Sequence, residues 1–262
     1  GWILECAGMD PTVVNGAVVL NWQTPHTVGN VRSGGSDLWV VEADESDRSL
    51  LRFHPDWAVI TNISRDHFTL DETRALFDQF ARQVRLGLVT PRDRPADWGR
   101  RMPLVSSGGS SFSYGGVEIQ VPLPGAHNAE NAWFAVAVCE RLGVTPATAA
   151  AALRTFRGIH RRLEMVGRVR DMVVIDDYAH NPAKLRAACL AVRREAGRLL
   201  AIWRPHGFGP LRAMRDELVD TFASVLRGDS GDRLFLLPVY DAGGTADRSI
   251  TSDDLAAGLE GR

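Results

Sequence analysis

Four carboxylates lie close together in the segment Glu42-Ala-Asp-Glu-Ser-Asp47. The segment closes a short, nearly continuous apolar run at residues 37–42, which is typical of a buried parallel strand. Open α/β sheets bind ligands beyond the carboxyl ends of their strands. Because close negative charges repel one another, the turn is interpreted either as a divalent-metal site, with Glu42 nearest the strand, or as an exposed acidic turn.

Asp66 and His67 follow the next apolar run, at residues 57–63. The ends of neighbouring parallel strands meet at one edge of a sheet, so these two side chains could face Glu42 there. Such an arrangement favours Glu42 and His67 as metal ligands. A structural His–Asp pair is the alternative, and a hydrolase dyad would also need a nucleophile that the sequence does not identify.

The segment Gly125-Ala-His-Asn-Ala-Glu-Asn131 stands at the start of a helix predicted over residues 128–142. Asn128 and Asn131 are three residues apart and therefore share one face of that helix. An asparagine amide offers a donor and an acceptor together, which matches the edge of adenine. The alternative is that Asn128 serves only as the helix N-cap.

A third polar turn, Asp176-Asp-Tyr-Ala-His-Asn-Pro182, follows a predicted strand at residues 173–175 and opens a predicted helix. Asn181 as N-cap and Pro182 in the first turn indicate a helix start, where anions bind favourably. Asp177 could then take a ribose hydroxyl, while His180 and Asn181 point toward phosphate or a reacting acyl group. A purely structural cap is the alternative.

Arginine and histidine side chains accompany this turn. Arg161 and Arg162 could clamp phosphate oxygens, although paired arginines usually form a solvated face. The segment Arg204-Pro-His-Gly-Phe208 again follows a predicted strand, so we expect His206 at the same carboxyl edge as His180. Its alternative interpretation is a simple turn.

The elements that must position these residues alternate between strand and helix in both halves of the chain. This alternation predicts an α/β protein of two doubly wound, mostly parallel-sheet domains, residues 1–160 and 161–262. A Gly/Ser stretch at 106–113 is expected to lead into an edge strand or hairpin at 117–121. The other predicted strands are 86–89, 199–203 and 234–239, and the other predicted helices are 2–7, 71–84, 146–156, 182–195 and 211–226.

Composition narrows the class of ligand. The 30 basic and 32 acidic residues are interleaved and give a net charge of −2, so no basic field for nucleic acid or a membrane surface is present. Three distant cysteines suggest neither a disulfide framework nor a zinc site and fit a reducing cytoplasm. No apolar run approaches the roughly 20 residues needed to span a bilayer. We therefore expect a cytoplasmic protein with small-molecule partners.

Taken together and in this order, these segments resemble the Mur ligase family, most closely its alanine-adding branch. The likeness includes Gly8-Met-Asp-Pro-Thr-Val-Val-Asn-Gly16 and runs over nearly the whole chain. It implies an ATP- and Mg²⁺-dependent amide-bond ligase of peptidoglycan precursor and cell-wall synthesis. Such an enzyme phosphorylates a UDP-N-acetylmuramate carboxylate, and the amine of an amino acid, L-alanine in that branch, then attacks the acyl phosphate. A Mur-like ligase that recycles muropeptides, or one that acts on another carboxylate, is the close alternative.

The resemblance also assigns roles to individual positions. It implies that Glu42 and His67 are magnesium ligands and that the helix start with His127, Asn128 and Asn131 contacts adenine. It further implies that the other residues bind the nucleotide or line the site where amino acid and acyl phosphate meet. These are Arg162, Asp177 and Asn181 on the nucleotide side, and Tyr178, His180 and His206 as the candidate catalytic set.

The chain departs from the family pattern at three places. The family's glycine-rich loop with its lysine is expected before the opening helix; no such loop occurs here, and Lys184, the only lysine, is expected on the surface of a helix. No lysine follows Asp66 and His67, where several members have a carbamylated one. Where the alanine-adding branch has P-H-R-F-T-R, this chain reads Pro205-His-Gly-Phe-Gly-Pro-Leu-Arg212. The resemblance therefore predicts a fragment that contains a central domain and a C-terminal domain, each truncated at its outer end. Such a fragment is expected to be inactive or only nucleotide-binding by itself. The identity of the substrate stays open.

Overall fold

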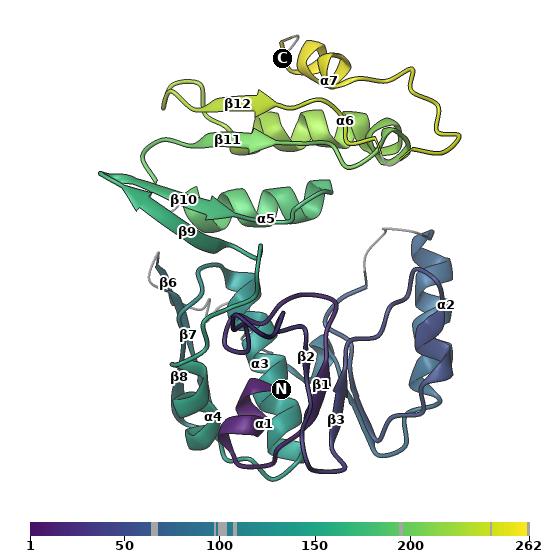
Figure 1. Ribbon diagram of the computed structural model, residues 1–262, viewed down its shortest axis with the longest axis vertical. Helices are drawn as coiled ribbons and strands as arrows, with labels where there is room; N and C mark the ends of the chain where they lie inside the picture. Colours follow the sequence, from purple (N-terminus) through teal and green to yellow (C-terminus); the bar gives the residue numbers. More distant parts are fainter. Residues whose placement is uncertain are drawn as a thin grey trace. The chain divides into compact units, whose positions relative to one another are not determined.

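The computed structural model describes the chain except residues 64–67, 97, 99–103, 107–108, 194–195, 242 and 261–262. Side chains of residues 104–106 are also outside the description. The chain divides into two compact units, Gly1–His160 and Arg161–Arg262, which we call unit 1 and unit 2 (Figure 1). Each unit combines helices with strands, and parallel strand pairs occur in both, which confirms the expected α/β class.

In unit 1, the described strands form three small sheets. The first has a central strand with one antiparallel and one parallel neighbour, the second is a parallel pair, and the third is an antiparallel meander. In this order the strands are β2 (Val31–Arg32), β1 (Thr12–Val14) and β3 (Trp39–Val41), then β4 (Trp57–Val59) and β5 (Gly87–Val89), then β6 (Leu104–Ser106), β7 (Gly109–Tyr114) and β8 (Val117–Val121).

Capping side chains begin two of the unit 1 helices. The Thr69 hydroxyl accepts the N–H of Glu72, whose carboxylate accepts the N–H of Thr69, a capping box that starts α2. Thr145 accepts from the N–H of Thr148 one residue before Pro146, as predicted for the start of α4. The helices are α1 (Trp2–Cys6), α2 (Leu70–Ala81), α3 (Ala126–Arg141) and α4 (Pro146–Leu153), with 3₁₀ turns η1 (Ser49–Arg52) and η2 (Pro91–Asp93).

Helices cover both faces of the β4–β5 pair. Leu88 packs into a cluster with Leu76 and Phe80 of α2, whereas the next residue, Val89, packs into a cluster with α3. Consecutive strand residues point to opposite faces, so the two helices lie on opposite sides of the pair. This is the doubly wound arrangement that the alternation of strands and helices predicted, and Figure 1 shows α2 and α3 on either side of the strands.

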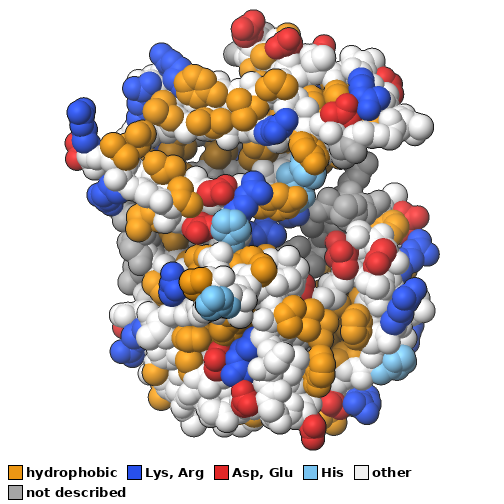
Figure 2. Space-filling model, in the orientation of Figure 1, with side chains coloured by type: hydrophobic (Ala, Val, Ile, Leu, Met, Phe, Trp, Pro, Cys, Tyr) orange, Lys and Arg blue, Asp and Glu red, His pale blue; other side chains and the backbone are white. Residues whose placement is uncertain are grey.

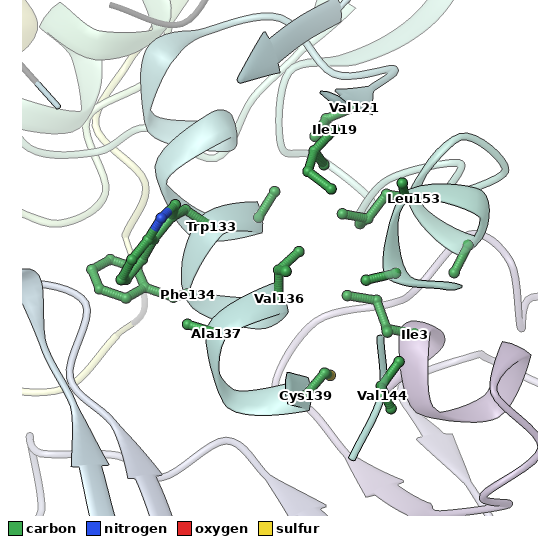
Figure 3. Close-up of a cluster of buried hydrophobic side chains, with 14 of the residues drawn as sticks. Ile3, Ile119, Val121, Trp133, Phe134, Val136, Ala137, Cys139, Val144 and Leu153 are labelled. Atoms are coloured by element: carbon green, nitrogen blue, oxygen red, sulfur yellow. The ribbon is translucent and has the colours of Figure 1, made fainter. Parts of the chain in front are cut away.

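The main core of unit 1 is built around α3. Its residues Trp133, Phe134 and Val136 are at most 4% exposed, and they pack with Ile119 of β8 and Ile3 of α1 (Figure 3). Burying apolar side chains on several sides of one helix makes α3 the central element of this unit. The helix start at residues 125–131 is therefore attached to the main core of unit 1.

Burial also determines how the cysteines should react. Burial raises the pKa of Cys139 to about 11, whereas Cys6 is exposed and its pKa is raised by partial burial and by the charge of Glu5. Since the thiolate is the reactive form, we expect iodoacetamide at pH 8 to alkylate Cys6 and to spare Cys139 until the chain is unfolded. Peptide mass spectrometry measures this, and equal rates for the two thiols in the folded protein would contradict it.

Unit 2 contains an antiparallel hairpin, a parallel strand pair and three helices in its described part. The parallel pair packs one face, through Trp203, Leu234 and Leu236, against the apolar side of the longest helix. The strands are β9 (Glu164–Val169), β10 (Met172–Asp176), β11 (Leu200–Trp203) and β12 (Arg233–Leu236), and the helices are α5 (Pro182–Arg193), α6 (Phe208–Val225) and α7 (Ser252–Glu260).

The other face of the β11–β12 pair is exposed. Ile202 is 70% exposed and Phe235 52%, whereas their neighbours Trp203 and Leu236 face the helices. Figure 2 shows hydrophobic side chains gathered over this part of unit 2. In the described part of the chain, no helix combines the length and apolar character required to cross a membrane.

Several strands and helix bounds differ from the predictions. The strands β1, β2 and β6 were not predicted, and α2 and α4 end at Ala81 and Leu153 instead of at residues 84 and 156. Residues 109–114, predicted as a connection, form β7, because hydrogen bonds to strands on both of its sides outweigh the low strand propensity of Gly and Ser. Residues 164–169 form β9, whose Gly and Arg hid the pattern of a strand. The helix predicted from 128 begins at Ala126, and the one predicted from 211 begins at Phe208.

Candidate functional site

Tyr178 is the centre of a polar cluster in unit 2. The guanidinium carbons of Arg161 and Arg162 lie 4.9 and 5.9 Å from the centroid of its ring. The ring of His180 lies 5.3 Å from it and that of His206 6.1 Å, both edge-on. Residues that precede β9, follow β10 and follow β11 therefore meet around one aromatic ring.

Asp177 holds the arginine pair beside this ring. Its two carboxylate oxygens accept the N–H groups of Leu163 and Ala179, each at 2.8 Å, and the N–H of Tyr178 donates to the carbonyl of Arg161 at 2.8 Å. Arg161 and Leu163 have φ values of 56° and 49°, a left-handed conformation that is unfavourable for both. The hydrogen bonds of Asp177 stabilise this strained segment, so the carboxylate has a structural task in addition to the predicted ribose contact.

Asn181 and Pro182 start α5 as predicted. The Asn181 side-chain oxygen accepts the N–H of Lys184 at 2.9 Å. Lys184 lies on α5, where it was predicted, and is half-buried. Its Nζ lies 3.3 Å from Nε2 of His180, four residues earlier. The contact with His180 was not predicted; it arises because residues four apart in a helical turn lie beside each other.

The partners of His180 assign its tautomer. Nδ1 lies 2.9 Å from the carbonyl oxygen of Tyr178, which can only accept a hydrogen bond. Nε2 faces the ammonium of Lys184, which can only donate. These two contacts match the tautomer with its proton on Nδ1, in which Nε2 accepts a hydrogen bond from the Lys184 ammonium.

His206 follows β11 and is exposed. Its ring stacks on Tyr240, with centroids 5.2 Å apart and planes at 6°, and Tyr240 lies beyond the end of β12. Tyr240 was not predicted as a site residue, because only the pairing of β11 with β12 brings it to His206. Arg204 also contacts the Tyr240 ring, at 5.3 Å from its centroid.

In unit 1, Glu42 follows β3 directly, as predicted. Its Oε2 accepts the N–H of Gly16 at 2.7 Å, and its Oε1 accepts no hydrogen bond from the described residues. Asp44 and Asp47 instead accept N–H groups of Ser46 and Ser49 within their own turn. Glu42 is thus oriented by the backbone with one oxygen left for a ligand, while at least two of the other three carboxylates shape the turn.

The predicted partners of Glu42, Asp66 and His67, lie outside the described residues. Among the residues that are described, no group of three or more His, Cys, Asp or Glu side chains is arranged to hold a metal ion. The exposed carboxylate oxygen of Glu42 is nevertheless of the type that Mg²⁺ prefers. One ligand of the predicted magnesium site thus has suitable chemistry.

At the helix start of residues 125–131, Asn128 is not the N-cap that the alternative interpretation required. Gly125, with φ of 102°, occupies the cap position, and Asn128 lies within α3. The Asn128 Nδ2 donates to the carbonyl of Pro124 at 2.6 Å, which leaves its side-chain oxygen as an acceptor. Asn131 is exposed one turn later on the same face, and His127 is half-buried. Asn128 and Asn131 thus share one face of α3, and their contact with adenine stays a prediction.

Comparisons with known proteins agree with these motifs. The family model described as Mur ligase, glutamate ligase domain matches residues 161–262. The UDP-N-acetylmuramate–L-alanine ligase of Rhizobium meliloti is 31% identical over 293 residues, covering 97% of this chain and 60% of the relative. That of Gloeobacter violaceus is 36% identical over 268 residues, covering 92% of this chain and 56% of the relative.

Solved structures share the fold. The UDP-N-acetylmuramate–alanine ligase MurC of Thermotoga maritima has a TM-score of 0.76 at 23% identity, covering 99% of this chain and 60% of that one. MurF of Acinetobacter baumannii has a TM-score of 0.62 at 18% identity, covering 90% and 64%. The chain spans about 60% of the length of the curated relatives named here. Residues 161–262 therefore belong to the family of Mur ligase glutamate ligase domains, and the whole chain is similar to UDP-N-acetylmuramate–L-alanine ligases over the part of their length that it covers.

Proposed function

We propose that a protein of the relatives' length containing this chain is an ATP-dependent ligase that joins L-alanine to the carboxylate of UDP-N-acetylmuramate in the cytoplasm. The observation that carries the proposal is the cluster of two arginines and two histidines around Tyr178. An identity of 31% to an alanine ligase, in an alignment that covers 97% of this chain, supports the choice of substrates. The product is a precursor of peptidoglycan.

The reaction has two steps whose charges these residues would stabilise. A carboxylate oxygen attacks the γ-phosphorus of ATP and ADP leaves; the amine then attacks the acyl carbon, phosphate leaves, and the amine loses a proton. Both steps concentrate negative charge on phosphate oxygens, which cationic groups such as Arg161 and Arg162 stabilise. Tyr178, His180 and His206 would border the acyl group. Mg²⁺, held by Glu42 and His67, would supply charge neutralisation at the phosphates when bound.

The nucleotide contacts are proposed from the remaining residues. Asn128 keeps an acceptor oxygen and Asn131 an exposed amide, so one face of α3 can bind the edge of adenine, with His127 beside it. Arg162 would bind phosphate, and Asp177 and Asn181 the ribose side. Each oxygen of Asp177 already accepts one backbone N–H and can accept one more hydrogen bond.

The proposal predicts alanine-dependent phosphate release. The full-length protein should release phosphate from ATP when UDP-N-acetylmuramate and L-alanine are both present, and mass spectrometry should detect the amide product. Omitting alanine is the matched control. Absence of stimulation by alanine or by any muramyl-peptide combination would overturn the proposal.

A muropeptide-recycling ligase is the alternative, favoured by one observation. Arg212 donates to Ser249 at 3.0 Å and pairs with Asp247 at 2.9 Å, so it holds the loop before α7 instead of facing a substrate. With Gly207 and Pro210 in place of expected arginines, the carboxylate of a single amino acid loses two binding groups. Competition between L-alanine and a muramyl tripeptide in the same assay decides: preference for the peptide supports recycling.

A further alternative concerns the 262 residues by themselves. They contain no glycine-rich loop followed by lysine. We propose that this chain alone is an inactive scaffold that binds ATP weakly or not at all. Titration calorimetry with ATP and Mg²⁺ tests this, and measurable turnover by the 262-residue chain would contradict it.

A further inference from the structure

Tyr240 is attached to the strand that carries His206 by backbone hydrogen bonds. Its N–H donates to the carbonyl of Pro205 at 2.9 Å, and the N–H of Leu237 donates to the carbonyl of Trp203 at 2.9 Å. Arg204 Nε donates to the carbonyl of Pro238 at 3.2 Å. These contacts continue the β11–β12 pairing beyond the last strand residues, so the place of the Tyr240 ring is determined by the register of the sheet.

The His206 ring has an aromatic neighbour on two sides. Tyr240 is parallel to it at 5.2 Å, and Tyr178 meets it edge-on at 6.1 Å. The side chain of His206 is otherwise exposed, and an exposed imidazole normally rotates about two torsions. Stacking with one ring and edge contact with another restrict both torsions.

We propose that Tyr240 is a positioning residue for His206, holding its imidazole in the orientation that presents its edge to Tyr178. The proposal rests on the proposed function only in taking His206 as part of the reacting site. Tyr240 is 42% exposed and belongs to neither the buried core nor its packed rim in unit 2. Its backbone contacts are available to any residue except proline, so the aromatic ring itself acts on the two side chains that it contacts, His206 and Arg204.

Nuclear magnetic resonance of the 262-residue chain tests the proposal directly. The ring protons of His206 should show an upfield ring-current shift and cross-relaxation with Tyr178. Tyr240→Leu should abolish both signals, and Tyr240→Phe should restore them, because phenylalanine keeps the ring. Phe235→Leu is the matched control, since Phe235 is an exposed aromatic on β12 that stacks on no other ring among the described residues.

The outcomes separate this proposal from the ligase assignment. Absence of the upfield shift in the wild-type chain overturns the positioning role even if Tyr240→Leu fails to fold. In the full-length protein, Tyr240→Leu should lower kcat roughly tenfold to a hundredfold with an unchanged KM for ATP, and Tyr240→Phe should recover it. If the wild-type protein has no ligase activity, the proposed function is contradicted, whereas the magnetic-resonance test of the positioning role is unaffected. Wild-type kcat in Tyr240→Leu overturns the positioning role.

Discussion

Replacing Glu42 with glutamine in the full-length protein is expected to lower ligase turnover about a hundredfold or more, the range in which loss of metal binding weakens phosphoryl transfer. Glutamine keeps an acceptor for the Gly16 N–H and almost the same volume, so the loop retains its conformation. It removes the negative charge on the exposed oxygen proposed to bind Mg²⁺. The expected defect is therefore in metal affinity and not in folding.

The measurement is the Mg²⁺ dependence of phosphate release. Glu42→Gln should require a higher Mg²⁺ concentration for half-maximal turnover and should recover part of its activity when Mg²⁺ is raised. Glu45→Gln is the matched control, because Glu45 lies in the same acidic turn but three residues beyond the strand end. An unchanged Mg²⁺ dependence in Glu42→Gln would remove this residue from the metal site.

Replacing Asp232 with asparagine is expected to destabilise unit 2 by about 3–5 kcal/mol, the cost of breaking a buried ion pair. The Asp232 side chain is 1% exposed and that of Arg193 is 9% exposed. The carboxylate accepts both Nη groups of Arg193 and, at 2.7 Å each, the N–H groups of Leu199 and Arg227. An asparagine NH₂ would face two of these donors, and the buried guanidinium would lose its negative partner while keeping its hydrogen bond to the Val225 carbonyl.

Asp241→Asn is the matched control for this change. Asp241 also pairs with an arginine, Arg248, but the two side chains are 41% and 46% exposed. Water screens the charges of an exposed pair, so this substitution should have little effect on the free energy of unfolding. Urea unfolding can be followed through the indole N–H of Trp203, the only tryptophan of residues 161–262. Equal losses in the two variants would contradict the buried-pair argument.

The same pair should make unit 2 sensitive to acid. Arg193, with the N–H groups of Leu199 and Arg227, holds the pKa of Asp232 well below its ordinary value. A lowered pKa in the folded state means that the stabilisation is complete above the unfolded pKa, about 3.9, and is lost as the pH falls toward the folded pKa. The free energy of unfolding should thus fall below about pH 4, and Asp232→Asn should lack this part of the slope.

Local sequence signals predicted the elements that begin or end at polar turns. Asn181 and Pro182, like Thr145 and Pro146, start helices because a side-chain acceptor and a fixed φ satisfy the first turn within a few residues. The short apolar runs likewise indicated β3, β4, β5 and β11. For the same local reason, the residues that follow directly from strand ends, Glu42 and Asp177 among them, could be identified from sequence.

Contacts between distant segments were decided only by the tertiary structure. The contact of His180 with Lys184 depends on where α5 places the lysine, and the orientation of His206 depends on Tyr240, which lies 34 residues later. The strand β7 exists because neighbours on both sides pair with it, despite its Gly/Ser-rich sequence. The polar turns at strand ends, and the candidate ligand residues in them, could thus be identified from the sequence alone. Which side chains orient one another followed from sheet register and helix packing, because those free energies arise only when the separate segments meet.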